Sequence, residues 1–159
     1  MDRKKIKREI NNQDRDLEKW DLIEIRVPSK SEYVSVVRLT ASGIANRLGF
    51  SYEDIEDIKM AIGEACVNCI QHAYPKRSDK DRIVVKFILT MSYLEIIVRD
   101  FGKGISQKTV EKYLNIEKKK KKGEPGFGIF LMKNLMDEVN YSKRCIKGTE
   151  VRMKKYISR

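Results

Sequence analysis

The sequence predicts an α+β fold, a two-layer α/β sandwich in which helices cover one face of a mostly antiparallel sheet. Strand-like segments come in pairs joined by short turns, which is typical of hairpins. Two longer segments instead carry apolar residues at helical spacing. Hairpins with helices gathered elsewhere favour separate layers over alternating βαβ units. With 159 residues, the chain has the length of a single domain.

The first half of the chain is predicted to form one strand followed by two helices. In both helical segments apolar residues recur every three or four positions, and a serine suited to N-capping precedes each. The expected elements are a strand over residues 22–27 that Pro28 ends, a helix from a Ser31 cap to about Leu48, and a longer helix from a Ser51 cap to about Ala73.

The second half is predicted to contain two hairpins and a glycine- and lysine-rich lid. The expected elements are strands over 81–90 and 93–99, a short helix over 109–115, a helix over 126–139, and a final hairpin of strands 141–146 and 149–156. Residues 1–19 are charged and lack an apolar stripe, so we expect a flexible arm. The domain is then expected over 20–159, with the lid at about 105–125.

Composition excludes several classes of protein. No apolar run approaches the ~20 residues that cross a bilayer, and no apolar segment of a secretory signal follows the basic start. Three cysteines are too few for a disulfide scaffold, which favours a reducing cytoplasm. We therefore expect a cytoplasmic protein without membrane contact.

The net charge of +11 is concentrated in the last third of the chain. Residues 101–159 hold 16 basic and 6 acidic residues, and Lys118 to Lys122 form the densest run. A solvated loop explains such a run, and so does a partner with phosphates or acidic side chains. The chain lacks an aromatic stacking platform or a recognisable reading helix, so no direct nucleic-acid binding is expected.

Glu64 and Asn68 lie four residues apart on the longer helix, and His72 lies four residues further on. A four-residue step turns a helix by only ~40°, so the three side chains form a nearly straight polar stripe. A carboxylate and a carboxamide one turn apart can orient a nucleophile and bind a hard cation through oxygen. Taken alone, such a stripe is more often the polar flank of an amphipathic helix.

Three glycine-containing segments are further candidates for ligand binding. In Asp100-Phe-Gly-Lys-Gly104 an aspartate at a strand end can accept a hydrogen bond from an amino group, and the glycines let the backbone turn against a flat ligand. Gly126-Phe127-Gly128 opens a helix, whose free N–H groups and positive dipole end suit phosphate. Gly148-Thr149 begins the last strand and offers a hydroxyl. An ordinary turn or loop explains each segment on its own.

The order of these motifs resembles the Bergerat-type ATP-binding fold shared by gyrase B, Hsp90, histidine kinases and MutL, over about residues 20–157. More narrowly, GEACVNCIQHAY and GFGIFLMKNLMDEV are similar to the small bacterial anti-sigma factors that are also serine-protein kinases, of the anti-sigma-B and anti-sigma-F type. The chain departs from the pattern at Pro125, where a richer glycine loop is often found. This proline implies a stiffer phosphate loop.

The resemblance implies roles for individual residues. Glu64 resembles the general base, Asn68 the Mg²⁺ ligand, and Asp100 the aspartate that holds the adenine amino group. The other residues implied to contact ATP are Gly102, Gly104, Ile105, Gly126, Phe127, Gly128 and Thr149. Arg38 matches an arginine that contacts partners in the anti-sigma-F type, and a solvated helix arginine is the alternative.

The resemblance also implies a function. It implies an ATP-dependent serine-protein kinase that uses Mg²⁺, phosphorylates an anti-anti-sigma factor and sequesters a sigma factor. Such proteins regulate bacterial transcription in stress response or sporulation, and they usually form homodimers. A non-catalytic ATP-binding interaction module is the alternative. Glu64 beside Asn68 favours the kinase, because sequestration of a partner requires no base.

Three cysteines and the single histidine call for separate interpretation. Cys66, Cys69 and His72 mimic metal-ligand spacing, with Cys145 as a fourth candidate for a zinc site. Two small cysteines on a packed helix are far more often part of the core. The sequence therefore predicts Cys66 and Cys69 as core residues.

Overall fold

A five-stranded sheet in the order β1-β2-β3-β5-β4, with every neighbouring pair antiparallel, forms one layer of the molecule. The computed structural model describes residues 20–73, 76, 78–104, 106–115, 121–142 and 147–158. The strands are β1 (Asp21–Pro28), β2 (Arg82–Leu89), β3 (Tyr93–Arg99), β4 (Glu138–Tyr141) and β5 (Glu150–Tyr156).

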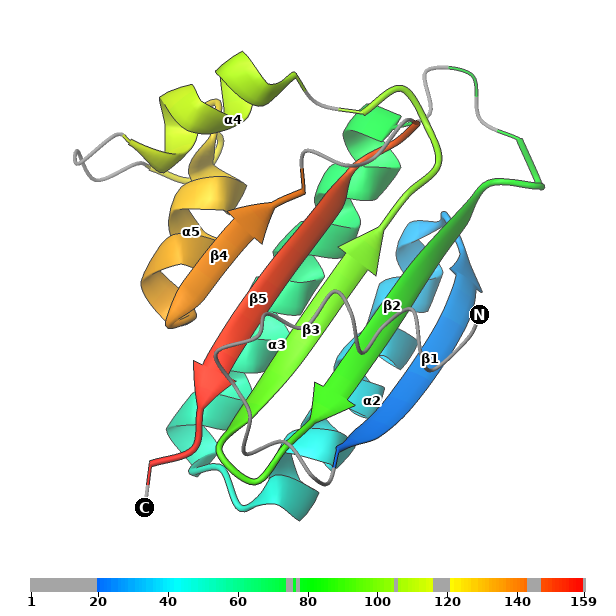
Figure 1. Ribbon diagram of the computed structural model, residues 1–159. Helices are drawn as coiled ribbons and strands as arrows, with labels where there is room; N and C mark the ends of the chain where they lie inside the picture. The colour runs from blue at the N-terminus through cyan, green and yellow to red at the C-terminus, as the bar shows by residue number, and fades with distance from the viewer. Residues whose placement is uncertain are drawn as a thin grey trace.

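Helices α2, α3 and α5 lie against one face of this sheet, and α4 lies beside α5 (Figure 1). The helices are α2 (Val34–Leu48), which a 3₁₀ turn (Ser31–Tyr33) precedes, α3 (Tyr52–Asn68), which a π-helical turn (Cys69–Ala73) continues, α4 (Gln107–Leu114) and α5 (Phe127–Leu135). The predicted α+β sandwich is confirmed.

The core lies between the sheet and the helices. Alternate residues of the central strands face the helices, as the two-residue period of a strand requires. The largest fully buried side chains between the two layers are those of Ile58, Ile62, Ile83, Phe87, Leu94, Ile96, Met132 and Met153. Cys66 and Cys69 are buried in the same cluster, so their prediction as core residues is confirmed.

The prediction was wrong at two helix boundaries. Ser31 does not cap a continuous helix, because residues 31–33 form the separate 3₁₀ turn. The helix expected over 126–139 ends at Leu135, where Met136 becomes extended. Pairing with β5 overrides the helical apolar spacing there: Asp137 N–H donates to Lys154 O at 2.9 Å, and Val139 stands opposite Met153.

The final hairpin is confirmed, but its first strand is displaced. The sequence placed that strand over 141–146, whereas β4 ends at Tyr141. Residues 143–146 lie outside the described residues, as do the arm over 1–19, Ile105, Cys145 and residues 116–120 of the expected lid. A bilayer-crossing helix is absent from the described part of the chain, since none of its helices is long and apolar enough.

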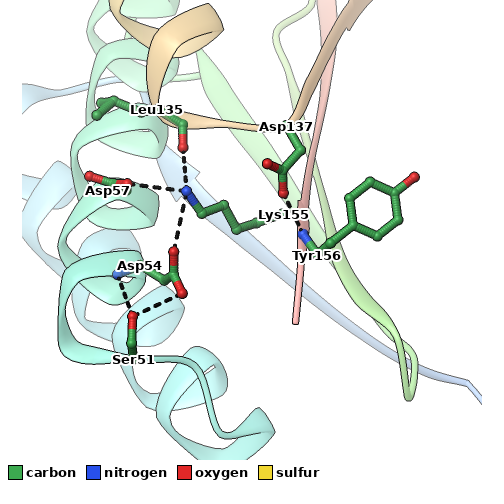
Figure 2. Close-up of polar contacts among 7 residues, drawn as sticks. All are labelled: Ser51, Asp54, Asp57, Leu135, Asp137, Lys155 and Tyr156. Atoms are coloured by element: carbon green, nitrogen blue, oxygen red, sulfur yellow. Dashed lines mark hydrogen bonds and ion pairs between the residues drawn. The ribbon is translucent and has the colours of Figure 1, made fainter. Parts of the chain in front are cut away.

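Lys155 of β5 joins the sheet to two helices (Figure 2). Its Nζ lies 3.1 Å from Asp57 Oδ2 and 3.4 Å from Asp54 Oδ1 on α3, and donates to Leu135 O at the end of α5 at 2.7 Å. Asp54 is itself fixed by Ser51, whose Oγ caps α3. Lys155 therefore sets how α5 lies along α3.

Lys155 is buried and charged. Burial acts to lower its pKa, but the hydrogen bonds and charges of Asp57 and Asp54 outweigh this and leave the pKa above the usual value. A raised lysine pKa means that the contribution to folding is fully present below the unfolded-state pKa of about 10.4. That contribution is lost as the pH rises through the folded-state pKa.

We predict that Lys155→Met lowers the free energy of unfolding by about 1–3 kcal/mol, because two carboxylates and a carbonyl lose a charged donor. Urea denaturation at neutral pH measures the change. Lys154→Met is the matched control: Lys154 is the neighbouring strand lysine, half-buried, 3.7 Å from Glu138 and over the Tyr93 ring, and contacts of this solvent-accessible kind contribute about 1 kcal/mol or less. Equal destabilisation by the two substitutions would contradict the proposed role of Lys155.

Candidate active site

One end of the molecule gathers the described residues of the four motifs that the sequence assigned to ligand binding. The end of β3, the start of β5, the last turn of α3 and the first turn of α5 all lie at this end (Figure 1). Helix α3 carries polar side chains into this region on its final turns. The site divides into a part around Asp100 and a part around Glu64.

The Asp100 carboxylate is the centre of the first part. Asp100 is only 2% exposed, and its Oδ1 accepts hydrogen bonds from Gly102 N–H at 3.0 Å and Thr149 N–H at 3.1 Å. Its own N–H donates to Thr149 O at 3.0 Å. Burial raises the pKa of Asp100, and the two backbone donors partly offset that rise. The carboxylate thus fixes the turn after β3 against the start of β5.

Glycines allow the backbone to close around Asp100. A Cβ on Gly102 would lie 1.9 Å from Ala73 O, the carbonyl to which Lys103 N–H donates at 2.6 Å. Gly148 has φ of +87°, and a Cβ there would lie 2.1 Å from Asp100 O. A side chain cannot be accommodated at either position without backbone movement. The predicted grouping of Gly102, Gly104 and Thr149 with Asp100 is therefore present, since Gly104 approaches Gly148 O.

The end of α3 reaches Asp100 through Cys69. The Cys69 thiol hydrogen-bonds the Asp100 carboxylate, and burial, followed by the charge of Asp100, raises the pKa of Cys69 well above its usual value. Burial likewise raises the pKa of Cys66 to about 12. Both thiols therefore stay protonated at neutral pH. The helix turns π-helical at Cys69, so the polar stripe predicted through His72 ends at Asn68 and His72 is exposed.

Glu64 and Asn68 meet the first turn of α5 in the second part of the site. A Cβ on Gly128 would lie 3.0 Å from Glu64 Oε2, 3.2 Å from Asn68 Oδ1 and 3.3 Å from Asn68 Nδ2. The carboxylate and carboxamide thus lie beside the positive end of the α5 dipole. Among the described residues, no side chain caps that helix. A helix start of this kind can bind an anion.

The remaining predicted site residues lie around this centre. Gly126 has φ of +82° and packs against the Tyr113 ring of α4, where a Cβ would lie 2.1 Å from the ring. Lys133 Nζ donates to Leu114 O, which also ties α4 to α5. Phe127 is half-buried at the start of α5, and Ile105 lies outside the described residues.

Arg38 lies apart from the motifs, on α2. It is exposed, and its side chain passes over Gly63 of α3, where a Cβ would lie 3.5 Å from Arg38 Cδ. Gly63 directly precedes Glu64. Arg38 therefore lies on α2, but its side chain borders the turn of α3 that carries the Glu64 carboxylate.

The fold and the site define a class of protein: an ATPase-type two-layer domain whose polar site residues lie near the end of α3 and directly after β3. Residues 27–155 match the family model described as Histidine kinase-like ATPase domain. Within that family, the chain belongs to the RsbW group of serine-protein kinases, because its relatives of that name align over most of both chains.

Two such relatives illustrate the similarity. Serine-protein kinase RsbW of Bacillus pumilus is 41% identical over 144 residues, which cover 87% of this chain and 88% of the relative. Serine-protein kinase RsbW of Bacillus mycoides is 41% identical over 147 residues, covering 90% and 89%.

The fold is also similar to a solved structure, that of the RsbU and RsbW domains of Rv1364c from Mycobacterium tuberculosis. The TM-score is 0.64 at 21% sequence identity. The alignment covers 87% of this chain and 33% of that chain, so the present chain corresponds to about a third of the larger protein. At this identity the likeness supports the fold alone.

Sequence reasoning missed two contacts of the site. Cys69 was assigned to the core, and nothing in its helical spacing indicated the hydrogen bond to Asp100. Tyr141, the last residue of β4, hydrogen-bonds Asn68 and was expected at the start of a strand. The one available signal was chemical: a tyrosine in an apolar strand generally places its hydroxyl against a polar partner.

We predict that Gly128→Ala weakens ATP binding by ~10-fold or more, since the methyl group would crowd Asn68 and the first turn of α5, and a displaced contact of ~1.4 kcal/mol has that effect. The fold should persist because the atoms nearest the added Cβ are side-chain ends. Titration calorimetry and thermal unfolding measure the two effects. Gly43→Ala in α2, where nothing lies within 4 Å of the added Cβ, is the control. Unchanged affinity in Gly128→Ala would contradict the proposed arrangement.

Proposed function

We propose that this chain is a serine-protein kinase that transfers the γ-phosphoryl group of ATP to a serine of an anti-anti-sigma factor and also sequesters a sigma factor. The observation that carries the proposal is the meeting of Glu64 and Asn68 with Gly128 at the start of α5. Membership of the RsbW group supports the kinase activity and the sigma factor as partner.

Asp100 recognises the adenine base in this proposal. Its carboxylate has about four acceptor positions. Three donors are accounted for, namely the N–H groups of Gly102 and Thr149 and the thiol of Cys69. The remaining capacity suits the exocyclic amino group of adenine. The tight approaches at Gly102 and Gly148 are to the carbonyls of Ala73 and Asp100, so these glycines hold the turn and the start of β5 against Asp100 and thereby position its carboxylate.

The start of α5 holds the phosphates. Phe127 N–H donates to Glu124 O, so the N–H groups that follow it, at Gly128 and the next residue, are the ones proposed to bind the anion, whose negative charge the helix dipole favours. Asn68 supplies an amide oxygen for Mg²⁺ on the facing helix, an oxygen ligand that suits this hard cation. A Mg²⁺ ion held by Asn68 would supply positive charge that neutralises the phosphates.

Glu64 is the general base. Its Oε2 lies beside Gly128, at the end of the site where the terminal phosphate is held. From this position Glu64 accepts the proton of the incoming serine hydroxyl, while the N–H groups of α5 hold the phosphate in line. Phosphoryl transfer depends mostly on such positioning and charge neutralisation. A purely binding module would have no use for a carboxylate placed at this point.

Partner binding is assigned to the α2 side of the molecule. Arg38 is exposed there and contacts the sigma factor, next to the turn that carries Glu64. We further propose a cytoplasmic homodimer built from a domain over 20–159, with the arm over 1–19 and a lid at about 105–125, acting in stress response or sporulation.

We predict that Glu64→Gln lowers the rate of phosphoryl transfer by ~10²–10⁴-fold, the usual scale for a positioned acid or base. The loss can be smaller, because a largely dissociative transition state requires less of the base. ATP affinity should stay near normal, since the adenine and phosphate contacts lie elsewhere. Single-turnover phosphorylation of anti-anti-sigma factors from the same genome measures the rate, and calorimetry measures the affinity.

The control separates catalysis from sequestration. Sigma-factor binding should persist in Glu64→Gln and weaken in Arg38→Ala, which should keep its ATP affinity. Full transfer activity in Glu64→Gln would remove Glu64 from the role of base. No phosphorylation by the wild type, with ATP and sigma binding intact, would instead favour the non-catalytic ATP-binding module.

A further inference from the structure

Helix α4 lies beside α5 (Figure 1), and Tyr113 is on the last turn of α4. The Tyr113 ring is half-buried and packs against the main core, as does Leu114. Val110, one turn earlier, is only 4% exposed. At the end of α4, Leu114 O accepts a hydrogen bond from Lys133 Nζ of α5. Apolar burial and a polar contact thus both fix α4, and with it the ring of Tyr113.

The Tyr113 ring lies against the backbone of Gly126, the N-cap residue of α5. A Cβ built on Gly126 would lie 2.1 Å from Cδ1, 2.5 Å from Cγ and 2.6 Å from Cε1 of the ring, so no side chain fits between them. Gly126 O accepts the first helical hydrogen bond of α5, from Phe130 N–H at 3.0 Å. The ring therefore contacts the residue at which the hydrogen bonding of α5 begins.

The first turn of α5 is held from two sides. Gly126 faces Tyr113 of α4, whereas Gly128 faces Glu64 and Asn68 of α3. Each residue of a helix turns the side-chain direction by ~100°, so positions two residues apart point roughly opposite ways. The ring of Tyr113 therefore supports this turn on the side away from Glu64 and Asn68.

We propose that Tyr113 is a positioning residue that fixes the first turn of α5 where its N–H groups receive the phosphates of ATP. This role rests on the proposed function, in which the N–H groups at Gly128 and the next residue bind those phosphates. Tyr113 acts through Gly126 and not by contact with ATP. Glycines lose more conformational freedom on ordering than other residues, and ordering donors during binding lowers affinity. The ring supplies the restriction that a turn with two glycines lacks.

The adenine side of the site is held by other segments. The backbone donors to Asp100, at Gly102 and Thr149, come from the turn after β3 and the start of β5. Neither segment belongs to α4 or α5. Loss of the Tyr113 ring should therefore weaken phosphate binding and spare the binding of the base.

The test is Tyr113→Leu, which keeps an apolar side chain but removes the flat ring. We expect ATP affinity to fall ~10-fold, which corresponds to the free energy of ordering the backbone of one residue. Adenosine affinity should be unchanged. Titration calorimetry with ATP and with adenosine, in the absence of protein substrate, gives both values, and thermal unfolding checks the fold. If Tyr113→Leu does not fold, Tyr113→Met, whose flexible side chain fills irregular gaps, is measured with the same expected result.

Two control variants accompany this test. Tyr113→Phe should keep the wild-type ATP affinity, because the atoms that approach Gly126 are ring carbons. Tyr52→Leu is the matched control for loss of a ring, since Tyr52 is 80% exposed at the start of α3, and it should change neither affinity.

The comparison of ATP with adenosine separates the possible failures. Equal weakening of both ligands by Tyr113→Leu would assign the ring a merely structural role and overturn the proposal. Unchanged ATP affinity in that variant, with a wild type that prefers ATP to adenosine, would overturn the role of Tyr113 alone. A wild type that binds adenosine as tightly as ATP would remove the phosphate site from α5, and the proposed function would fail together with this inference.

Discussion

The buried Asp100 carboxylate is the interaction on which the site depends. Through one oxygen it holds two backbone N–H groups from segments about fifty residues apart in the chain, and its contact with Cys69 adds the end of α3. A buried carboxylate is costly unless such donors surround it. The donors that offset the cost of burying Asp100 come from three segments. They therefore hold the turn after β3, the start of β5 and the end of α3 together.

Helix α3 connects the part of the site around Asp100 to the part around Glu64. Near its start, Asp54 and Asp57 hold Lys155, which also binds the final carbonyl of α5. Near its end, Asn68 and Cys69 are held by Tyr141 and Asp100. With α5 anchored at Leu135 by Lys155, its first turn lies where Gly128 meets Glu64. The Lys155 contacts at the opposite end of both helices thus add an anchor to the packing of α5 against α3.

The sequence was informative wherever local spacing determines structure. The four-residue step from Glu64 to Asn68 predicted that the two side chains lie together, because the helix period is a local property. The turn glycines were likewise readable from the sequence, because the backbone freedom of glycine is local. It was uninformative wherever a distant partner decides. Val139 belongs to a helix-like apolar pattern, but pairing with β5 makes it part of β4. The contacts of Cys69 and Tyr141 likewise depend on strands that only the folded chain brings near.

The preference of the Asp100→Asn protein for ATP or ITP tests the proposed role of Asp100 most directly. Asn can still accept from Gly102 and Thr149 through Oδ1, but it presents an amide N–H where the carboxylate presented an acceptor. Competition between ATP and ITP, whose base carries a carbonyl in place of the amino group, should show ATP affinity reduced by ~10- to 100-fold, as an unpaired buried donor costs about 1–3 kcal/mol. The preference should shift toward ITP. An unchanged preference for ATP in a folded Asp100→Asn protein would contradict the account.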